Sequence, residues 1–219
     1  MRIGVLGTGP VGHAFGTRLV ELGHEVTMGA RDQANPRAAG WAAGAGERAR
    51  AGDFTAAAHA AEMIVNATAG SHSVEALNQA TPAEGTVVLD VSNALGGGFP
   101  PVLTVPYGDS VAERLQRAQP GVRVVKALNT MNGDIMVNPE LVPGPHDVFV
   151  AGDDDAAKGA VRALLRQFGW PAGSIMDVGG LTAARGLEAG VLFWVALRVA
   201  IGHNRFNFHV AQAGSVPAS

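Results

Sequence analysis

The sequence predicts an α/β fold built on a doubly wound parallel sheet. Along residues 1–130, short apolar runs alternate with segments whose apolar residues recur at helical spacing. This order is typical of parallel strands joined by crossover helices. A glycine-rich turn, Gly7-Thr8-Gly9-Pro10-Val11-Gly12, directly follows the first apolar run. The pattern changes after about residue 130, so we expect a small α/β C-terminal extension over residues 131–219.

The glycine-rich turn has the spacing of the dinucleotide-binding fingerprint. Gly7 allows the tight turn out of the strand, Gly9 lets the backbone approach a pyrophosphate, and Gly12 lets the next helix pack closely. That helix, predicted from about Pro10 to Leu22, directs its free N–H groups at the phosphates. Residues 1–130 are therefore predicted to be a Rossmann, NAD(P)-binding domain. The alternative is a glycine-rich turn that binds no ligand.

The end of the second predicted strand, Glu25 to Arg31, favours NADP(H) over NAD(H). Sites that prefer NAD carry an acidic residue about 20 residues beyond the glycines, which binds the ribose 2′-hydroxyl. Ala30 and Arg31 occupy that place, and a guanidinium is a bidentate partner for a 2′-phosphate. Asp32 can point away from the site, and Arg37 can add a second positive charge. The alternative is that Arg31 is an ordinary surface arginine.

Composition excludes several functional classes. The 219 residues are 47% hydrophobic and 16% charged, with a net charge of −3, so we expect neither disorder nor binding to nucleic acid or an anionic membrane. The chain has no cysteine, which excludes disulfides, thiolate metal sites and cysteine nucleophiles. It enters a strand without a secretory or transit signal, and its apolar run Val191 to Ile201 is too short to span a bilayer. We therefore expect a soluble, cytoplasmic protein.

The remaining periodicity places the other elements. Ala34 to Gly52 is expected to form a loop with a weak helix. Strands are predicted over Glu62–Thr68, Gly85–Ser92, Val122–Leu128, Asp147–Gly152, Ser174–Val178 and residues 206–210. Helices are predicted over Thr55–Ala61, Ser73–Ala80 with Ser71 as its cap, Ser110–Ala118, Asp153–Phe168 and Leu181–Ile201. The tail Ala213–Ser219 is expected to be loose.

The ligands of a doubly wound sheet lie beyond the carboxyl ends of its strands. Apart from Arg31, the residues at those ends are small and neutral, so they leave room for a flat ring. They are Gly7 to Pro10, Ala30 and Arg31, Ala67-Thr68-Ala69, Ser92 and Asn93, and Ala127 to Met131.

Other chemistries find little support in the sequence. The seven histidines are scattered without an HExxH or similar metal spacing, and there is no GxSxG elbow, so we expect no metal site. Asp153 to Asp155 could bind a hard cation, but an acidic helix start is the favoured interpretation. His72 is a candidate proton donor near the nicotinamide, and its alternative is a surface histidine at a helix start.

The strand ends carry no obvious acidic group, and this bears on the reaction. Reduction of a ketone usually requires an acid that protonates the developing alkoxide. Hydride exchange between two redox cofactors mainly requires stacked rings at the right distance. The sequence therefore favours exchange between two cofactors.

Five segments occur together in an order that is typical of one family. They are Gly7 to Gly12, Gly29-Ala-Arg-Asp32, Asp90-Val-Ser-Asn93, Lys126-Ala-Leu-Asn-Thr-Met131 and Gly152-Asp-Asp-Asp155. On these segments the chain resembles the NADP oxidoreductases dependent on coenzyme F420, a deazaflavin, over nearly its whole length. The resemblance implies NADP(H) on the N-terminal sheet. It also implies a flavin-like ring stacked on the nicotinamide, in a cleft closed by residues 131–219.

The resemblance also implies roles for individual residues. It places Thr8, Gly9, Pro10 and Val11 on the pyrophosphate, Arg31 on the 2′-phosphate, Ala67, Thr68, Ala69 and Asn93 along the ribose and nicotinamide, and Asn129, Thr130 and Met131 near the facing rings. Members often carry Ser before the arginine, where this chain has Ala30. They are often homodimers, which would suit the apolar helix over residues 191–201. The basic residues nearest the expected anionic tail of the deazaflavin are Arg185, Arg198, His203 and Arg205.

Three functions remain open on the sequence. The leading hypothesis is an oxidoreductase that transfers a hydride between NADP(H) and a deazaflavin-type acceptor such as coenzyme F420. The second is an NADPH-dependent reductase of another small molecule, which would be a flavin, quinone, imine or carbonyl compound. The third is a non-catalytic NADPH sensor.

Overall fold

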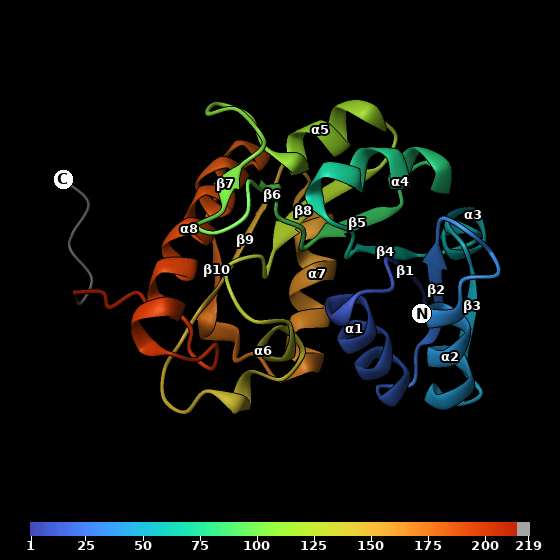
Figure 1. The fold of residues 1–219 in the computed structure, drawn as a ribbon, viewed down its shortest axis with the longest axis horizontal. Coiled ribbons are helices and arrows are strands. Elements are labelled where there is room, and N and C mark those ends of the chain that lie inside the picture. Colours follow the sequence, from blue (N-terminus) through green and yellow to red (C-terminus); the bar gives the residue numbers. More distant parts are fainter. Residues whose placement is uncertain (214–219) are drawn as a thin grey trace.

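Strands and helices alternate along the computed structural model of the protein, which describes residues 1–213 (Figure 1). The strands are β1 (Arg2–Leu6), β2 (Glu25–Ala30), β3 (Ala49–Asp53), β4 (Met63–Asn66), β5 (Val87–Asp90), β6 (Leu95–Gly96), β7 (Val102–Leu103), β8 (Arg123–Ala127), β9 (Val148–Gly152) and β10 (Ile175–Asp177). The α-helices are α1 (Pro10–Glu21), α2 (Pro36–Ala45), α3 (Phe54–Ala58), α4 (Ser73–Ala80), α5 (Val111–Ala118), α6 (Gly133–Val137), α7 (Asp155–Phe168) and α8 (Ala184–Ile201). Short 3₁₀ turns lie at η1 (Gly70–His72), η2 (Pro139–Leu141), η3 (Ala172–Ser174) and η4 (Leu181–Ala183).

The main sheet has the strand order β10-β9-β8-β5-β4-β1-β2-β3. Its strands from β8 to β3 are parallel, as the βα alternation predicted. In the C-terminal region, β9 joins β8 in the antiparallel sense and β10 pairs in parallel with β9. The C-terminal region therefore extends the same sheet, and the predicted fold class, a doubly wound sheet with a small α/β extension, is confirmed.

Helices cover both faces of the sheet (Figure 1). Helices α1, α2, α6 and α7 lie on one face, and α3, α4, α5 and α8 lie on the other. Neighbouring residues of a strand point to opposite faces, so Val65 packs into the first layer and Ile64 into the second. Both side chains are fully buried. Burial on both faces explains why the central strands have continuous apolar sequences.

Several elements differ from the expectations. The segment from Ala34 to Gly52 contains helix α2 and also the edge strand β3, which the sequence analysis missed. Strand β3 reads Ala-Arg-Ala-Gly-Asp and lacks β-branched residues; it pairs in register with β2 and α2 packs against it. Helix α6 and the small β6–β7 hairpin were also missed. Ser71 is not a helix cap, because it lies within η1 and α4 begins at Ser73.

The predicted last strand over residues 206–210 is wrong. This segment runs beside the start of β9, and Phe208 accepts one backbone hydrogen bond from Asp147. The other contacts use side chains: the Asp147 carboxylate accepts from the Val210 amide at 2.6 Å, and the Asn207 amide donates to the Asp147 carbonyl at 2.9 Å. These bonds take the place of a strand ladder. Most of the tail that was expected to be loose, residues 214–219, lies outside the described residues.

The long helix predicted over Leu181–Ile201 is confirmed, with its first turn forming η4 and the rest forming α8. Phe206 stacks on Trp194 with ring centres 5.4 Å apart, and Phe208 stacks on Phe193 at 5.8 Å. The segment after α8 thus folds back onto this helix. Within residues 1–213, no helix combines the length and the apolar character needed to cross a membrane.

The acidic run Asp153 to Asp155 lies at the start of α7, as the favoured interpretation of the sequence predicted. Asp154 is the N-cap and accepts from the Ala157 amide at 2.8 Å, and it also accepts from the Arg123 guanidinium at 3.1 Å. Asp153 accepts from the Leu181 amide at 2.7 Å. Asp155 is 97% exposed at its side chain and pairs with Lys158. The three carboxylates therefore have separate partners within the protein.

Replacing the cap, Asp154→Ala, should lower the free energy of unfolding by about 1 kcal/mol, because the first turn of α7 loses its side-chain acceptor. The matched change Asp155→Ala should stay within about 0.5 kcal/mol, because it removes only an exposed ion pair. Urea denaturation followed by circular dichroism measures both. Equal losses would contradict the assignment of Asp154 as the cap.

Candidate functional site

The glycine-rich turn brings β1 and α1 together as its spacing predicted. Gly7 has a φ of +117°, and a Cβ there would lie 2.6 Å from the Ala67 carbonyl oxygen. A Cβ on Gly12 would collide with the Gly7 carbonyl oxygen. Gly9, in contrast, faces open space and is the N-cap of α1 without a side-chain cap. The first N–H groups of α1 therefore lack protein acceptors and form a site suited to a phosphate.

A first cleft opens beside this turn with a volume of about 250 Å³, and we call it the adenosine cleft after the part of the dinucleotide that we propose binds there. It is lined by Gly7, Thr8, Gly9, Arg31, Phe54, Ala67, Thr68, Ala69, His72, Glu75 and Ala76. Arg31 is exposed, and within residues 1–213 no carboxylate pairs with its guanidinium. Asp32 instead accepts from the Ala34 amide at 2.9 Å, which directs its carboxylate to its own loop. The guanidinium is thus available to a bound anion.

A second cleft adjoins the first and has a volume of about 400 Å³, and we call it the acceptor cleft after the electron acceptor that we propose binds there. The two clefts share Ala67 and Thr68 at the end of β4. The other lining residues are Val11, Val91, Ser92, Asn93, Leu95, Gly98, Phe99, Pro101, Asn129, Met131, Gly133, Met136, Val191, Trp194, Val195 and Arg198. Arg198 is the one ionisable side chain among them. Residues at the carboxyl ends of β4, β5 and β8 form one wall of this cleft, and α8 forms the other.

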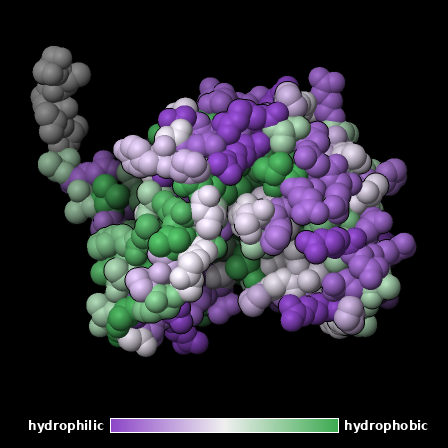
Figure 2. Space-filling view, turned by 45° about the horizontal axis from the view of Figure 1, so that its top comes forward, coloured by the Kyte–Doolittle hydropathy of each residue, from purple (hydrophilic) through white to green (hydrophobic). Residues whose placement is uncertain are grey.

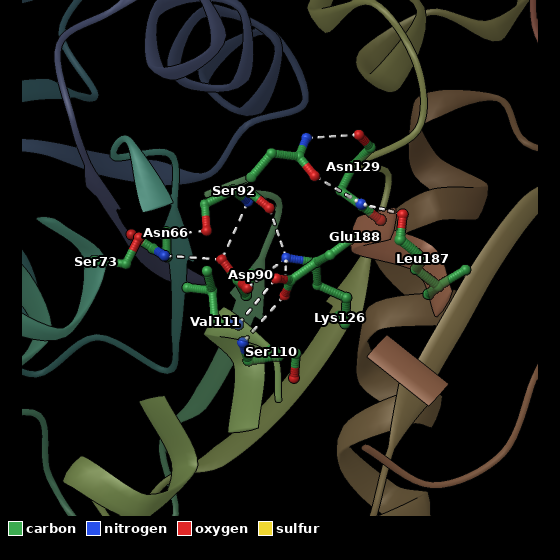
Figure 3. A network of polar contacts seen from close by, with 12 residues as sticks. Asn66, Ser73, Asp90, Ser92, Ser110, Val111, Lys126, Asn129, Leu187 and Glu188 are labelled. Atoms are coloured by element: carbon green, nitrogen blue, oxygen red, sulfur yellow. Dashed lines mark hydrogen bonds and ion pairs between the residues drawn. The ribbon is translucent and has the colours of Figure 1, made fainter. Parts of the chain in front are cut away.

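Beneath the acceptor cleft lies a buried polar network centred on Lys126 (Figure 3). Lys126 is on β8 and its side chain is 0% exposed. Its ammonium donates to the Asp90 carboxylate at 2.8 Å and to the Ser92 carbonyl at 2.6 Å, and it lies 2.9 Å from the Glu188 carboxylate. Because a buried charge is tolerated only when it is paired and hydrogen-bonded, these contacts account for the ammonium in an apolar interior.

Both carboxylates of the network have further donors. Asp90 accepts from the Asn66 amide at 2.8 Å and from the Ser92 backbone N–H at 3.1 Å. Glu188, on α8, accepts from the first N–H groups of α5, at Val111 (2.9 Å) and Ala112 (3.3 Å). A carboxylate at a helix N-terminus is stabilised by the unpaired N–H groups and the helix dipole. The network thus joins β4, β5 and β8 to α5 and α8.

Two asparagines at the edge of the acceptor cleft hold each other. The Asn93 amide donates to the Asn129 carbonyl at 2.8 Å, and the Asn129 amide donates to the Asn93 side-chain oxygen at 2.9 Å. Asn129 also donates to the Leu187 carbonyl of α8 at 2.8 Å. The ends of β5 and β8 are therefore tied to each other and to the helix that closes the cleft.

The structure brings together most of the candidate residues. Gly7, Thr8, Gly9, Arg31 and Ala69 line the adenosine cleft, Val11, Asn93, Asn129 and Met131 line the acceptor cleft, and Ala67 and Thr68 line both. Pro10, Gly12, Ala30, Ala127 and Thr130 line neither cleft. His72 lies on the adenosine cleft with Arg31, with its side chain 59% exposed, and it is not among the residues of the acceptor cleft.

The basic residues expected near an acceptor tail separate into two groups. Arg185 donates to Glu113 of α5 at 2.6 and 2.9 Å, and this contact holds the pKa of Glu113 below its usual range. Arg198 lines the acceptor cleft and also a neighbouring cavity of about 540 Å³, which includes His203. Arg205 lines neither of these cavities.

The sequence analysis quoted Asp90 and Lys126 within motifs but missed their pairing, and it missed Glu188 entirely. A signal was present, because both charged residues directly follow apolar residues of a buried strand, in Val-Val-Leu-Asp of β5 and in Arg-Val-Val-Lys-Ala of β8. A charged side chain on a strand whose two faces are both buried requires a partner of opposite charge. The contribution of Trp194 and Phe99 to the cleft had no comparable signal, because their places depend on how α8 and the β6–β7 hairpin pack.

The fold, the glycine-rich turn and the two adjoining clefts define a dinucleotide-binding protein of the Rossmann class. The family model described as NADP oxidoreductase, coenzyme F420-dependent, matches residues 2–94. The crystal structure of a candidate F420-dependent NADP reductase from Arthrobacter sp. FB24 is 40% identical, with a TM-score of 0.91. That match covers 97% of this chain and 100% of the other. The chain therefore belongs to the coenzyme F420-dependent NADP oxidoreductase family, and it is an NADP-dependent oxidoreductase.

Two more distant proteins match most of this chain. The metalloreductase STEAP3 of Rattus norvegicus is 30% identical over 193 residues, which are 86% of this chain and 36% of that protein. This chain thus spans about a third of the length of that relative. An imine reductase variant from Myxococcus stipitatus, solved with NAD⁺, matches 91% of this chain and 63% of its own. With 19% identity and a TM-score of 0.62, it shows the fold alone. Membership of an oxidoreductase family sets aside the non-catalytic sensor.

Replacing the buried ammonium, Lys126→Met, should lower the free energy of unfolding by about 3–5 kcal/mol, because Asp90 and Glu188 would face each other without a cation. The chain's other lysine provides the control. Lys158 has a side chain that is 10% exposed, but it pairs with Asp155 and Asp177, whose side chains are 97% and 32% exposed. Water can solvate both carboxylates once the ammonium is removed, so Lys158→Met should cost at most about 1 kcal/mol. Urea denaturation of both variants measures the difference, and similar costs would contradict the central role of Lys126.

Proposed function

We propose that the protein transfers a hydride between NADP(H) and a deazaflavin-type acceptor such as coenzyme F420. In this proposal the adenosine end of NADP(H) lies in the adenosine cleft, with its 2′-phosphate on Arg31 and its pyrophosphate at the N-terminus of α1. The nicotinamide and the acceptor ring share the acceptor cleft. Residues 1–130 then bind the dinucleotide, and residues 131–219 close the acceptor side.

The observation that carries this proposal is the chemistry of the acceptor cleft. Its walls are apolar at Met131, Val191 and Trp194, and it contains no Asp, Glu, His, Lys or Tyr side chain. A carbonyl or imine substrate would need a positioned acid. An acceptor ring that takes up the hydride and draws its proton from solvent needs only a dry slot and a correct distance from the nicotinamide. The cleft fits the ring acceptor.

The residues of the chain then bind and orient rather than exchange protons. Asn93 retains one amide N–H after its bond to Asn129, and it can donate this N–H to a carboxamide. Val191 and Trp194 exclude water from the ring faces. We assign no proton transfer to His72, because it lines the adenosine cleft with Arg31. The cofactor itself supplies the hydride chemistry when it is bound.

Arg198 supports an acceptor that carries an anionic tail. It stands where the acceptor cleft meets the cavity lined by Phe99, Gly202, His203 and Asn204. A ring in the acceptor cleft would therefore leave through an opening flanked by a guanidinium. Deazaflavins of the coenzyme F420 type have such a tail, and a charge-assisted contact with Arg198 would favour them.

A flavin or a quinone is the second candidate for the acceptor. The same apolar cleft without an acid suits these rings, and a relative of this chain is named a metalloreductase. A simple quinone has no anchoring charge and would leave Arg198 without a role. The phosphate of FMN could bind Arg198, so the deazaflavin ranks above a flavin only because the matching family is described as coenzyme F420-dependent. Imines and carbonyl compounds fit less well, because the lining of the cleft offers no acid.

We also propose that the protein is a homodimer, which the exposed side of α8 supports. Apolar surface gathers over the side of the molecule that carries α8, on the left of Figure 2. Phe193 and Val199 of α8 are each 60% exposed, and exposed apolar surface of this kind often marks a protein interface. The cytoplasmic location expected from the sequence stays a prediction.

Removing the guanidinium, Arg31→Ala, should weaken NADPH binding by about 1.5–3 kcal/mol, roughly 10- to 150-fold, because a charge-assisted contact with the 2′-phosphate is lost. NADH, which lacks that phosphate, should bind nearly as before. Fluorescence titration with both nucleotides measures the two affinities. Arg50→Ala, on the exposed edge strand β3, controls for the change in net charge. Equal losses for NADPH and NADH in Arg31→Ala would contradict the specificity assigned to this residue.

Mixing the protein with NADPH and oxidised coenzyme F420 should reduce the deazaflavin, which its absorbance reports directly. Arg198→Ala should raise the KM for coenzyme F420 by about tenfold, the value of one charge-assisted contact. The KM for a deazaflavin without the anionic tail should not change. FMN and a quinone serve as competing acceptors. Faster turnover of either, or no reduction of the deazaflavin, would move the assignment to the second candidate.

A further inference from the structure

Two adjacent residues of α8 are tied to the strand ends that form the floor of the acceptor cleft. The Leu187 carbonyl accepts from the Asn129 amide at 2.8 Å, and the Glu188 carboxylate lies 2.9 Å from the Lys126 ammonium. Asn129 and Lys126 both come from the end of β8 or just beyond it. Helix α8 is thus fixed to this end of the sheet at one level of its length.

The Lys126 ammonium also contacts the loop that carries a lining residue of the acceptor cleft. Lys126 donates to the Ser92 carbonyl at 2.6 Å, and the next residue, Asn93, lines the cleft. Asp90 holds the same loop from the other side by accepting from the Ser92 N–H at 3.1 Å. A single buried cation therefore connects the Glu188 carboxylate of α8 with the loop that carries Asn93.

Helix α8 carries the opposite wall of the cleft. Val191 and Val195 follow Glu188 by three and seven residues, so all three lie on one face of the helix. Both valines line the cleft. Since a helix is stiff over two turns, the position of Glu188 against Lys126 sets how far this wall stands from Asn93 on the floor.

We propose that Lys126 and Glu188 are positioning residues that set the width of the acceptor cleft, and with it the alignment of the nicotinamide with the acceptor ring. The proposal rests on the proposed function, because it requires the nicotinamide in that cleft. Neither side chain touches the cofactor or the acceptor; both act through Ser92, Asn93 and α8. A displacement of about 1 Å at a reacting centre can cost about a hundredfold in rate.

The chain offers a matched control that joins the same two helices. Glu113 of α5 accepts from Arg185 of α8 at 2.6 and 2.9 Å and from the Ser110 hydroxyl at 2.7 Å. This pair ties α5 to α8, as Glu188 does. It has no contact with Lys126 or with the loop at Ser92. If weaker packing between α5 and α8 is what impairs the cleft, substitutions of Glu113 and of Glu188 should both impair it. If positioning through Lys126 matters, only substitution of Glu188 should do so.

The test compares Glu188→Gln with Glu113→Gln. In either variant the amide replaces one carboxylate oxygen that accepts hydrogen bonds, so one donor loses its partner. The NADPH dissociation constant and the fluorescence of bound NADPH are measured first, without any acceptor. The first quantity reports mainly the adenosine end, and the second reports the surroundings of the nicotinamide. Turnover with oxidised coenzyme F420 follows, and circular dichroism and thermal melting verify that each variant is folded.

For Glu188→Gln we expect an NADPH dissociation constant within about threefold of the wild type, because the contacts of the adenosine cleft are unchanged. The fluorescence change of bound NADPH should be largely lost, and kcat with the deazaflavin should fall at least about tenfold. Glu113→Gln should keep both properties. Should Glu188→Gln not fold, Glu188→Asp and Glu113→Asp give the same comparison, because they withdraw the carboxylate by one methylene.

The outcomes separate the two proposals. Equal effects of the two substitutions on nicotinamide fluorescence and on kcat, or no effect of either, would overturn the positioning role. A wild-type protein that binds NADPH with no change in its fluorescence would contradict the nicotinamide placement, and the proposed function with it. Loss of the fluorescence change in Glu188→Gln alone would support the positioning role even if the physiological acceptor were a flavin.

Discussion

The buried ammonium of Lys126 holds strand β8, the end of strand β5 and helix α8 together. Lys126 has no exposed surface and is paired with carboxylates from a neighbouring strand and from α8. Taking three charges out of water is expensive, and the cost is offset only when every donor and acceptor is satisfied. That requirement makes the packing of α5 and α8 against the sheet specific, because a small shift would leave a buried charge without its partner.

The two clefts are built from different parts of the fold, and the network around Lys126 lies beneath the acceptor cleft. The glycine-rich turn and Arg31 line the adenosine cleft, where we propose that the backbone and one guanidinium bind the dinucleotide. The acceptor cleft is instead formed between the sheet edge and α8, whose residues Val191 and Trp194 supply an apolar wall. Under the proposed function, specificity for the acceptor would thus depend on the C-terminal region, which also extends the sheet through β9 and β10.

The sequence predicted the elements whose apolar pattern is strong and missed those that depend on neighbours. Strands β1, β4, β5 and β8 are buried on both faces, so their apolar runs are visible in the sequence. The edge strand β3 is Ala-Arg-Ala-Gly-Asp and is held by its register with β2. Residues 206–210 alternate like a strand, yet side-chain bonds to Asp147 decide their conformation.

The sequence by itself determined the Rossmann turn, the place of Arg31 and the uncharged residues just beyond β1, β4, β5 and β8, because these depend on local residue types and on short spacing. Only the tertiary structure decided that Lys126 and Glu188 meet, since they are 62 residues apart in the chain. It also decided that His72 lines one cleft with Arg31 and that Trp194 lines the other with Asn93. Contacts of this kind follow from how helices pack on a sheet, and no spacing within one segment encodes them.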